Sequence, residues 1–314
     1  MVASSPDIAV VGALAYDQIA TTSASLSGSR AAAGAHPLPL LNCKVDTLTE
    51  AFGGCGGNIA YNLAHNGNCT PLLISVTGSA DDQKYTAHLD AYGISPAGLL
   101  RLENTLCARA IIITDRDGHQ FTAFYPGKVP SKDVWLAHLR QLPLHRCPVF
   151  VQAPYPPELM IASLRFAATL DHNPLKVCCP GQYADQLKPT QTRELARHAD
   201  WIIGNAYEIG HLQRASSLTG KWILQTNGAN AIEVTKPDGQ QLRFAVPAVP
   251  LIVDPTGCGD AFLSSIASDL VRRETLASDD HLAAAIATAC DHAALCLGFS
   301  GGQQHFALEN RHNG

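Results

Sequence analysis

The chain has 314 residues, of which 46% are hydrophobic and 16% are charged, and its formal net charge is −5. This length and composition fit a globular protein with a sizeable core, and the weak charge excludes nucleic acid and anionic membranes as its main partners. No apolar run approaches the roughly 20 residues of a membrane span, and the first residues lack the pattern of a secretory signal. We therefore expect a cytoplasmic protein.

The ten cysteines are scattered along the chain and form no C-x-x-C pair. A chain of this length does not need a disulfide framework, and the spacing does not fit a zinc site. We predict that most of these cysteines are small buried apolar residues.

Short, continuous apolar runs recur along the chain, each bounded by Gly, Pro or Asn. Such runs are typical of strands that are buried on both faces of a parallel sheet. Segments with helical spacing, such as 81–93 and 156–170, lie between them. The alternation predicts an α/β fold, with a doubly wound, mostly parallel sheet flanked by helices. The predicted strands are 8–14, 71–78, 108–114, 148–154, 175–181, 201–205 and 222–228.

Two regions interrupt this alternation and predict a small β-sheet lid. The first, within 15–52, is rich in Ser, Ala, Gly and Pro from residue 20 onward. The second, 115–128, reads as an Asp-Gly turn followed by an alternating aromatic strand. We expect one domain over 1–314, and the exposed edge of the lid leaves open a homodimer through it. A further hairpin, 231–247, turns at Asp238–Gly239.

The stretch "VDPTGCGDAF" (253–262) has the composition of an anion-binding turn. Gly257 and Gly259, which flank Cys258, allow a tight turn that aims backbone N–H groups at one point. The apolar spacing that follows predicts a helix from about Asp260, whose N-terminus adds partial positive charge. A carboxylate beside a bound anion is placed to act as a general base. The alternative is an ordinary N-cap aspartate after a glycine turn.

The stretch "FGGCGGNIAYNLAHNG" (52–67) places four glycines before Asn58 and a predicted helix over 58–66. No Gly-Lys-Ser/Thr follows, so it is not a Walker A motif. The glycines predict a backbone surface that lies against a hydroxyl-rich ligand, with Asn58 donating and accepting hydrogen bonds. The alternative is a flexible loop that Asn58 caps.

Further polar residues follow predicted strands, where α/β proteins bind ligands. Asp17 comes just after the first strand and could chelate vicinal hydroxyls, although a turn residue is the more common role. Asn205 and Glu208 lie three residues apart at a strand-to-helix junction. This pair could organise water around Mg²⁺, or it could be a capping box with the same spacing.

Taken together and in this order, these motifs resemble those of the ribokinase-like (PfkB) family of sugar and nucleoside kinases over nearly the whole chain. "GGCGGNIA" resembles the first family signature, "DPTGCGDAFLSSI" the second, and "NAYE" the family's N-x-x-E. The resemblance implies that Asp260 is the catalytic base and that Gly257, Cys258 and Gly259 form the anion hole. It also implies that Asp17, Gly54 and Asn58 hold sugar hydroxyls, that Asn205 and Glu208 act on Mg·ATP phosphates, with Glu208 reaching Mg²⁺ through water, and that Thr226 and Gly228 lie near the nucleotide.

Two details resemble the adenosine and nucleoside kinases of this family. They are the signature "VDPTGCGDAF" and the lid stretch "FTAFYPGK", in which an aromatic side chain can stack on a nucleobase. Phe124 is our candidate, with Phe121 and Tyr125 as rivals. Strand alternation places Phe121 and Tyr125 on one face and Phe124 on the other, so only one set can line the pocket. Alternatively, these aromatics pack the lid against a partner subunit.

We therefore expect an ATP-dependent kinase that phosphorylates the primary 5′ hydroxyl of a nucleoside, with adenosine as the preferred acceptor. Mg²⁺ and ATP are the expected cofactor and co-substrate, and dependence on a monovalent cation stays open. A sugar kinase for ribose, fructose or a sugar phosphate is the first alternative. The few basic residues of the lid, Arg30, Lys44 and Lys128, favour an uncharged acceptor.

The alternative from another class is a catalytically silent relative that binds nucleotide as a sensor or scaffold. The intact Asp260 and the glycine turn before it argue against that reading. Asp254, at the start of the same motif, is assigned a structural role in bracing the turn.

Overall fold

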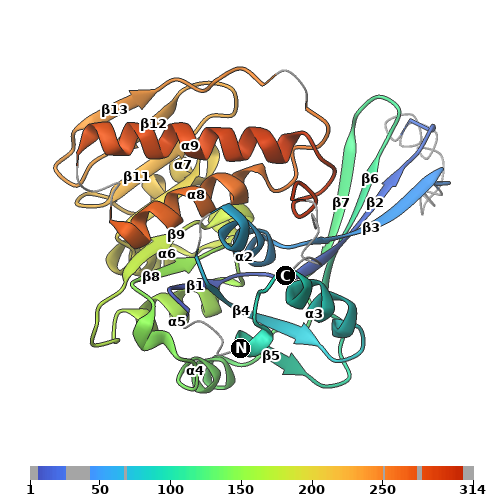
Figure 1. Ribbon diagram of the computed structural model, residues 1–314, viewed down its shortest axis with the longest axis horizontal. Helices are drawn as coiled ribbons and strands as arrows, with labels where there is room; N and C mark the ends of the chain where they lie inside the picture. Colours follow the sequence, from blue (N-terminus) through green and yellow to red (C-terminus); the bar gives the residue numbers. More distant parts are fainter. Residues whose placement is uncertain (1–5, 26–42, 67–68, 250–251, 274–277, 307–314) are drawn as a thin grey trace, which may run out of the picture.

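The computed structural model describes residues 6–25, 43–66, 69–249, 252–273 and 278–306 (Figure 1). Its core is a nine-stranded sheet in the order β13-β12-β11-β10-β9-β8-β1-β4-β5. Neighbouring strands are parallel except at one edge, where the β12–β13 hairpin adds antiparallel pairs. The strands are β1 (Ile8–Val11), β4 (Pro71–Gly78), β5 (Leu99–Leu102), β8 (Val149–Gln152), β9 (Leu175–Cys178), β10 (Trp201–Asn205), β11 (Trp222–Thr226), β12 (Ile232–Thr235) and β13 (Gln241–Phe244).

Helices cover both faces of this sheet, as the doubly wound prediction requires. Ile8 and Val10 of β1 pack into one hydrophobic cluster, whereas Ala9 and Val11 pack into another on the opposite face. The first face carries α2 (Cys55–Asn66), α3 (Asp82–Ala91), α8 (Cys258–Arg272) and α9 (Asp279–Leu297). The second carries α4 (Lys132–Leu139), α5 (Pro157–Ala167), α6 (Pro189–His198) and α7 (Ala206–Ala215). Short 3-10 helices span Pro96–Gly98, Leu144–Arg146 and Gly181–Gln186.

The carboxyl end of β1 is the topological switch point of the sheet, because β1 lies between β4 and β8. The backbone continues both pairings there: Gly12 donates to Ile74 (3.2 Å) and Ala153 donates to Val11 (2.8 Å). Gly56 of α2 packs directly on Gly12, since a Cβ on Gly56 would come within 2.6 Å of the Gly12 carbonyl carbon. The start of α2 is therefore held against the crevice where such folds bind ligands.

A second sheet of four strands stands off the core and forms the lid (Figure 1). Its order is β3-β2-β6-β7, with β2 (Ala15–Thr21), β3 (Thr47–Gly53), β6 (Ala108–Thr114) and β7 (Gln120–Tyr125). Part of the predicted lid, residues 26–42, lies outside the described residues. The assignment of 108–114 to the core sheet was wrong. Three consecutive isoleucines mask the alternation of β6, in which Ile112 is buried and Ile111 is 41% exposed.

Element boundaries shift in two places that bear on the site. Helix α2 begins at Cys55 rather than at Asn58, so the glycines form its first turn instead of a loop before it. Helix α8 begins at Cys258, before Asp260. The short strand β5, in which Arg101 interrupts the apolar pattern, was not predicted.

Most of the cysteines are buried and none forms a disulfide, as predicted. All ten cysteines are free, six of them are buried, and only Cys43 is exposed. Among the described residues, no helix combines the length and the apolar character needed to cross a membrane.

Candidate active site

The turn before α8 has the geometry of an anion-binding loop. Gly257 is the N-cap of α8 and has a φ of 81°, a left-handed conformation that favours glycine. The N–H groups of the first helical turn have no acceptor within the helix and point outward. Cys258 departs from the predicted anion hole, because its N–H lies 3.4 Å from the Pro255 carbonyl oxygen. The cap is a glycine, so the reading of Asp260 as an N-cap aspartate was wrong.

Asp254 braces this turn, as predicted. Its Oδ1 accepts a hydrogen bond from the N–H of Thr256 (2.9 Å), and its Oδ2 accepts one from the N–H of Gly301 (2.8 Å). The carboxylate thereby ties the turn to the C-terminal segment of the described chain.

Asp260 lies in the first turn of α8 and faces a cleft with Glu208. Its Oδ2 accepts a hydrogen bond from Nδ2 of Asn58 (2.7 Å). Burial raises the pKa of Asp260 to about 7; the negative charges of Asp17 and Glu208 add to the rise, whereas hydrogen bonds from Asn58 and Cys55 oppose it. A carboxylate with a pKa near neutrality is well matched to general-base catalysis.

Asp17 reaches the same site from the lid strand β2. Its side chain is almost fully buried, and its carboxylate lies against the backbone of Gly53. A Cβ at Gly53 would come within 2.0 Å of Asp17 Oδ2, so only glycine leaves room for the acid. Burial, with the nearby charge of Asp254, raises the pKa of Asp17 to about 6. The next residue, Gly54, has a φ of 82° and leads the chain into α2.

Asn205 and Glu208 form a capping box, which confirms that reading of the pair, and both residues also line the cleft. Asn205 Oδ1 accepts from the N–H of Glu208 (3.0 Å), and Glu208 Oε2 accepts from the N–H of Asn205 (3.0 Å). Burial raises the pKa of Glu208, against the hydrogen bonds from Asn205. Thr226 lines this cleft together with Gly259 and Asp260, whereas Gly228 lies in the turn beyond and is not among its lining residues.

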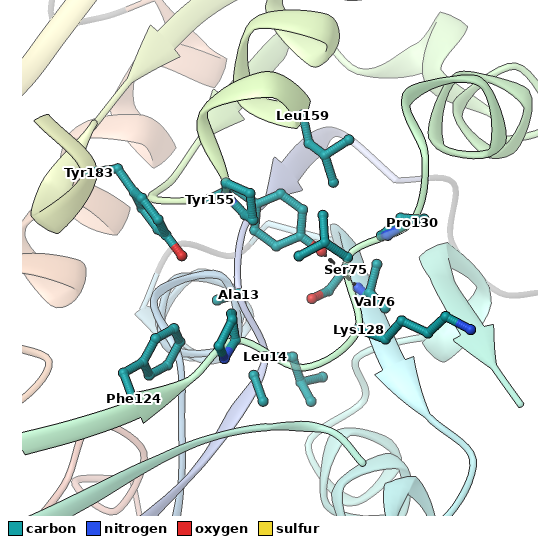
Figure 2. Close-up of a pocket in the computed structure, with 14 residues that line it drawn as sticks. Ala13, Leu14, Ser75, Val76, Phe124, Lys128, Pro130, Tyr155, Leu159 and Tyr183 are labelled. Atoms are coloured by element: carbon teal, nitrogen blue, oxygen red, sulfur yellow. Dashed lines mark hydrogen bonds between the residues drawn. The ribbon is translucent and has the colours of Figure 1, made fainter. Parts of the chain in front are cut away.

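A separate pocket lies between the lid and the carboxyl ends of β1 and β4 (Figure 2). Strand register places Asp17, Ala110 and Phe124 on one face of the lid, with Phe121 and Tyr125 on the other. Only Phe124 of the three candidate aromatics lines the pocket. Tyr183, from the 3-10 helix after β9, lies across the pocket from Phe124 in Figure 2. Other lining residues are Ala13, Leu14, Ser75, Lys128, Tyr155 and Leu159.

The segment 301–306 completes the site, and sequence reasoning missed it. Gln303 Nε2 donates to Asn58 Oδ1 (2.9 Å), although the two residues are 245 positions apart. His305 Nε2 lies 2.9 Å from Oδ1 of Asn62, one turn further along α2. Cys55, which forms a hydrogen bond with Asp260, was also missed. No local pattern marks any of these residues.

The packing of His305 predicts a loss of stability in mild acid. Burial, with the nearby His65 and His292, lowers the pKa of His305 to about 4, and among the described residues its Nδ1 has no hydrogen-bond partner. The unfolded chain therefore takes up this proton near pH 6.5, and the folded chain does so only near pH 4. Stability should fall by up to about 1.4 kcal/mol per pH unit between these values.

Thermal unfolding at several pH values checks this expectation. The melting temperature of His305→Gln should fall less steeply between pH 7 and pH 5 than that of the wild type. His281→Gln, at an exposed position of α9, serves as the control. Identical slopes for all three proteins would contradict the assignment to His305.

Comparison with known proteins agrees with this fold. The nucleoside kinase of Burkholderia thailandensis, solved in complex with inosine, superposes with a TM-score of 0.79 and 24% identity, covering 95% of this chain and 93% of that one. The same enzyme in complex with ADP-inosine gives a TM-score of 0.76 and 25% identity, covering 95% and 91% of the two chains. The ribokinase of Giardia lamblia also gives 0.79, at 15% identity and 96% coverage of both chains.

Sequence comparison gives the family. The nucleoside kinase of Methanocaldococcus jannaschii is 24% identical over 247 residues, which cover 75% of this chain and 78% of that one. The family described as pfkB family carbohydrate kinase matches residues 5–307. The chain therefore belongs to the pfkB family of carbohydrate kinases and is a phosphotransferase that acts on a hydroxyl group.

Proposed function

We propose that this protein is an ATP-dependent kinase that phosphorylates the primary 5′ hydroxyl of a nucleoside, with adenosine as the preferred acceptor. The observation that carries the proposal is the position of Asp260. It lies at the positive end of α8, shares one cleft with Glu208, and is hydrogen-bonded to Asn58 beside Asp17. This arrangement joins a phosphate-binding end to a hydroxyl-binding end, with a base between them.

Each end of the arrangement has a defined task. Asp17 and Asn58 hold the ribose hydroxyls against the backbone of Gly54, and Asp260 takes the proton of the attacking hydroxyl. The N–H groups at the start of α8 bind the charge that develops on the transferred phosphoryl group, because such transfer depends mainly on positioning and electrostatics. ATP, bound toward Thr226, is the phosphoryl donor.

Mg²⁺ fits the donor set at Glu208. Both carboxylate oxygens of Glu208 accept hydrogen bonds from Asn205, which orients the acid toward the cleft and suits contact through water. Bound there, the ion would neutralise charge on the ATP phosphates.

The pocket in Figure 2 favours a nucleoside over a simple sugar. Phe124 shares a face of the lid with Asp17, and it lines the pocket together with Tyr183. A planar base can stack on the ring of Phe124, whereas ribose and fructose have no aromatic face to stack on it. Lys128 lines the pocket and Lys44 is exposed, whereas Arg30 lies outside the described residues.

An ADP-release assay over a panel of nucleosides and sugars tests the proposal. We expect the highest kcat/KM with adenosine among the nucleosides and weak activity with ribose and fructose. Activity on sugars alone would favour a sugar kinase of the same family. Nucleotide binding without ADP release on any acceptor would favour a catalytically silent relative.

Removing the aromatic ring of Phe124 should weaken nucleoside binding. Stacking of a base on an aromatic side chain is worth about 1–3 kcal/mol, so Phe124→Ala should raise the KM for the nucleoside on the order of tenfold. Phe121→Ala, on the opposite face of the same strand, is the matched control and should leave this KM within about twofold. Equal effects of the two changes would contradict the stacking role.

The outer face of the lid supports a homodimer, which we include in the proposal. Leu48, Ile111, Phe121 and Tyr125 share this face and are 65%, 41%, 57% and 44% exposed. Such exposed apolar surface is typical of protein interfaces. Sedimentation analysis should show a dimer that Ile111→Lys converts to a monomer, and a monomeric wild type would refute this part.

A further inference from the structure

A chain of hydrogen bonds links the root of the lid to Asp260 through the C-terminal segment. His88 Nε2 of α3 lies 2.9 Å from Oε1 of Gln303. Gln303 Nε2 donates to Oδ1 of Asn58 (2.9 Å), and Nδ2 of Asn58 donates to Oδ2 of Asp260 (2.7 Å). Gln303 is 3% exposed, so water does not compete for these bonds.

The direction of every bond in this chain follows from one backbone carbonyl. The hydroxyl of Tyr85 donates to the carbonyl oxygen of Gly53 (2.7 Å), which can only accept. The same hydroxyl must therefore accept from Gln303, whose Nε2 lies 2.7 Å away. That fixes the amide of Gln303 with Nε2 toward Asn58, and it leaves Asn58 with Oδ1 toward Gln303 and Nδ2 toward Asp260.

We infer that Gln303 is a positioning residue for the phosphoryl-transfer step: its amide holds Asn58 in the one orientation in which Asn58 donates to the base. An asparagine amide has similar shape in both orientations, and the reverse orientation would put its oxygen against the carboxylate of Asp260. Gln303 removes this ambiguity without touching substrate. The inference rests on the proposed role of Asp260 as base.

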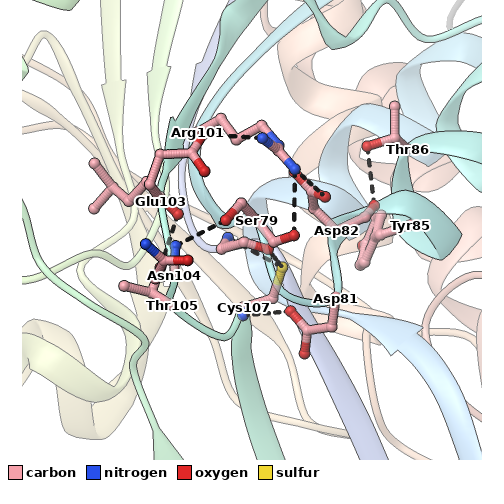
Figure 3. Close-up of polar contacts among 12 residues, drawn as sticks. Ser79, Asp81, Asp82, Tyr85, Thr86, Arg101, Glu103, Asn104, Thr105 and Cys107 are labelled. Carbon is pink, nitrogen blue, oxygen red and sulfur yellow. Dashed lines mark hydrogen bonds and ion pairs between the residues drawn. The ribbon is translucent and has the colours of Figure 1, made fainter.

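The residues that fix the orientation of Gln303 also connect it to the lid. Gly53 is the last residue of lid strand β3, and the ring of His88 stacks on Phe52 of that strand at 3.8 Å. Helix α3 is fixed to the other lid strands at its start. There, Cys107 N–H donates to Asp81 (2.7 Å; Figure 3), and the hydroxyl of Tyr16 donates to the carbonyl oxygen of Asp81 (2.7 Å). Lid strands β2 and β3 and the hydrogen bonds that orient Asn58 thus meet at α3 and the residue before it.

Several other groups also shift the pKa of Asp260, and they would still do so in a Gln303 variant. Cys55 of α2 and Asn58 donate to its carboxylate, whereas Asp17 of β2 and Glu208 of α7 raise its pKa by their charge. The thiols of Cys179, after β9, and Cys258 also face it. Of these groups only Asn58 is hydrogen-bonded to Gln303, so an uncharged substitution at residue 303 should reach Asp260 through that amide.

Two substitutions at residue 303 test the inference. Gln303→Met keeps the length of the side chain, removes the donor and adds no charge. Gln303→Glu keeps the shape but offers only acceptors when it is ionised, which favours the reversed Asn58, and its charge adds to the rise in the pKa of Asp260. We expect kcat at pH 6.5 to fall about fivefold in the first and tenfold or more in the second. We also expect the acidic limb of the kcat–pH profile to move to higher pH, by less in Gln303→Met than in Gln303→Glu and by up to about one pH unit.

Three controls keep the outcomes distinct. Asp260→Asn shows whether Asp260 is the base at all, so its full activity would refute the proposed function rather than the inference. Tyr85→Phe keeps the ring but removes the hydroxyl that sets the direction, and it should shift the profile the same way even if residue 303 variants fold poorly. If Asp260→Asn is inactive while Gln303→Met and Tyr85→Phe retain the wild-type kcat and pH profile, the inference is wrong.

Discussion

Replacing Asp260 with asparagine should lower kcat at least about a hundredfold, the lower end of what a general base contributes, with the KM for ATP within about twofold. The amide keeps the shape of the carboxylate but cannot take the proton of the attacking hydroxyl. Because burial holds the pKa of Asp260 at about 7, the wild-type kcat should rise as pH increases through 7. Steady-state kinetics from pH 5.5 to 9 would show this limb, and the variant should lack it.

The control is the same substitution elsewhere on the same helix. Asp269 lies near the other end of α8 and pairs with Arg272 at the surface. Asp269→Asn should retain nearly full activity and an unchanged acidic limb. If Asp260→Asn kept more than half of the wild-type kcat, Asp260 would not be the base.

The core sheet could be predicted because the burial of each strand shows in the residues of that strand alone. Parallel strands buried on both faces are apolar at successive positions, and the four residues of β1 show no exposed surface. The same rule misplaced β6, because a run of isoleucines looks alike whether one face or both faces are covered. The pairing of β6 with β2, which begins at Ala15 and Ala108, shows that β6 belongs to the lid, and that pairing joins distant parts of the chain.

The candidate site divides in the same way. The turn at Gly257 and the Asn205–Glu208 pair could be read from sequence because each motif is built by neighbours. Even so, the sequence could not choose between a capping box and a phosphate site for the pair, since the two have the same spacing; the structure shows the capping box at the edge of a cleft. Gln303 carried no signal, because an isolated glutamine acquires its role only when α2 and the C-terminal segment pack together.

The glycine turn gives the second large effect that we expect. Gly257→Ala should lower kcat on the order of a hundredfold, comparable to the loss of a donor from an oxyanion hole. An added Cβ would come within 2.6 Å of Gly302 Cα, which is backbone and cannot yield by a side-chain rotation. The turn must therefore move, and the N–H groups at the start of α8 would no longer point toward the same position.

Backbone strain alone would not produce this loss, and a matched variant separates the two causes. Gly239 has a φ of 90°, compared with 81° for Gly257, but a Cβ there meets nothing within 4 Å, and it lies in the remote β12–β13 turn. Gly239→Ala should cost about 1 kcal/mol of stability, measured by denaturant unfolding, and leave kcat unchanged. If both variants lost stability equally and both kept kcat, the N–H groups before Asp260 would not be binding the transferred phosphoryl group.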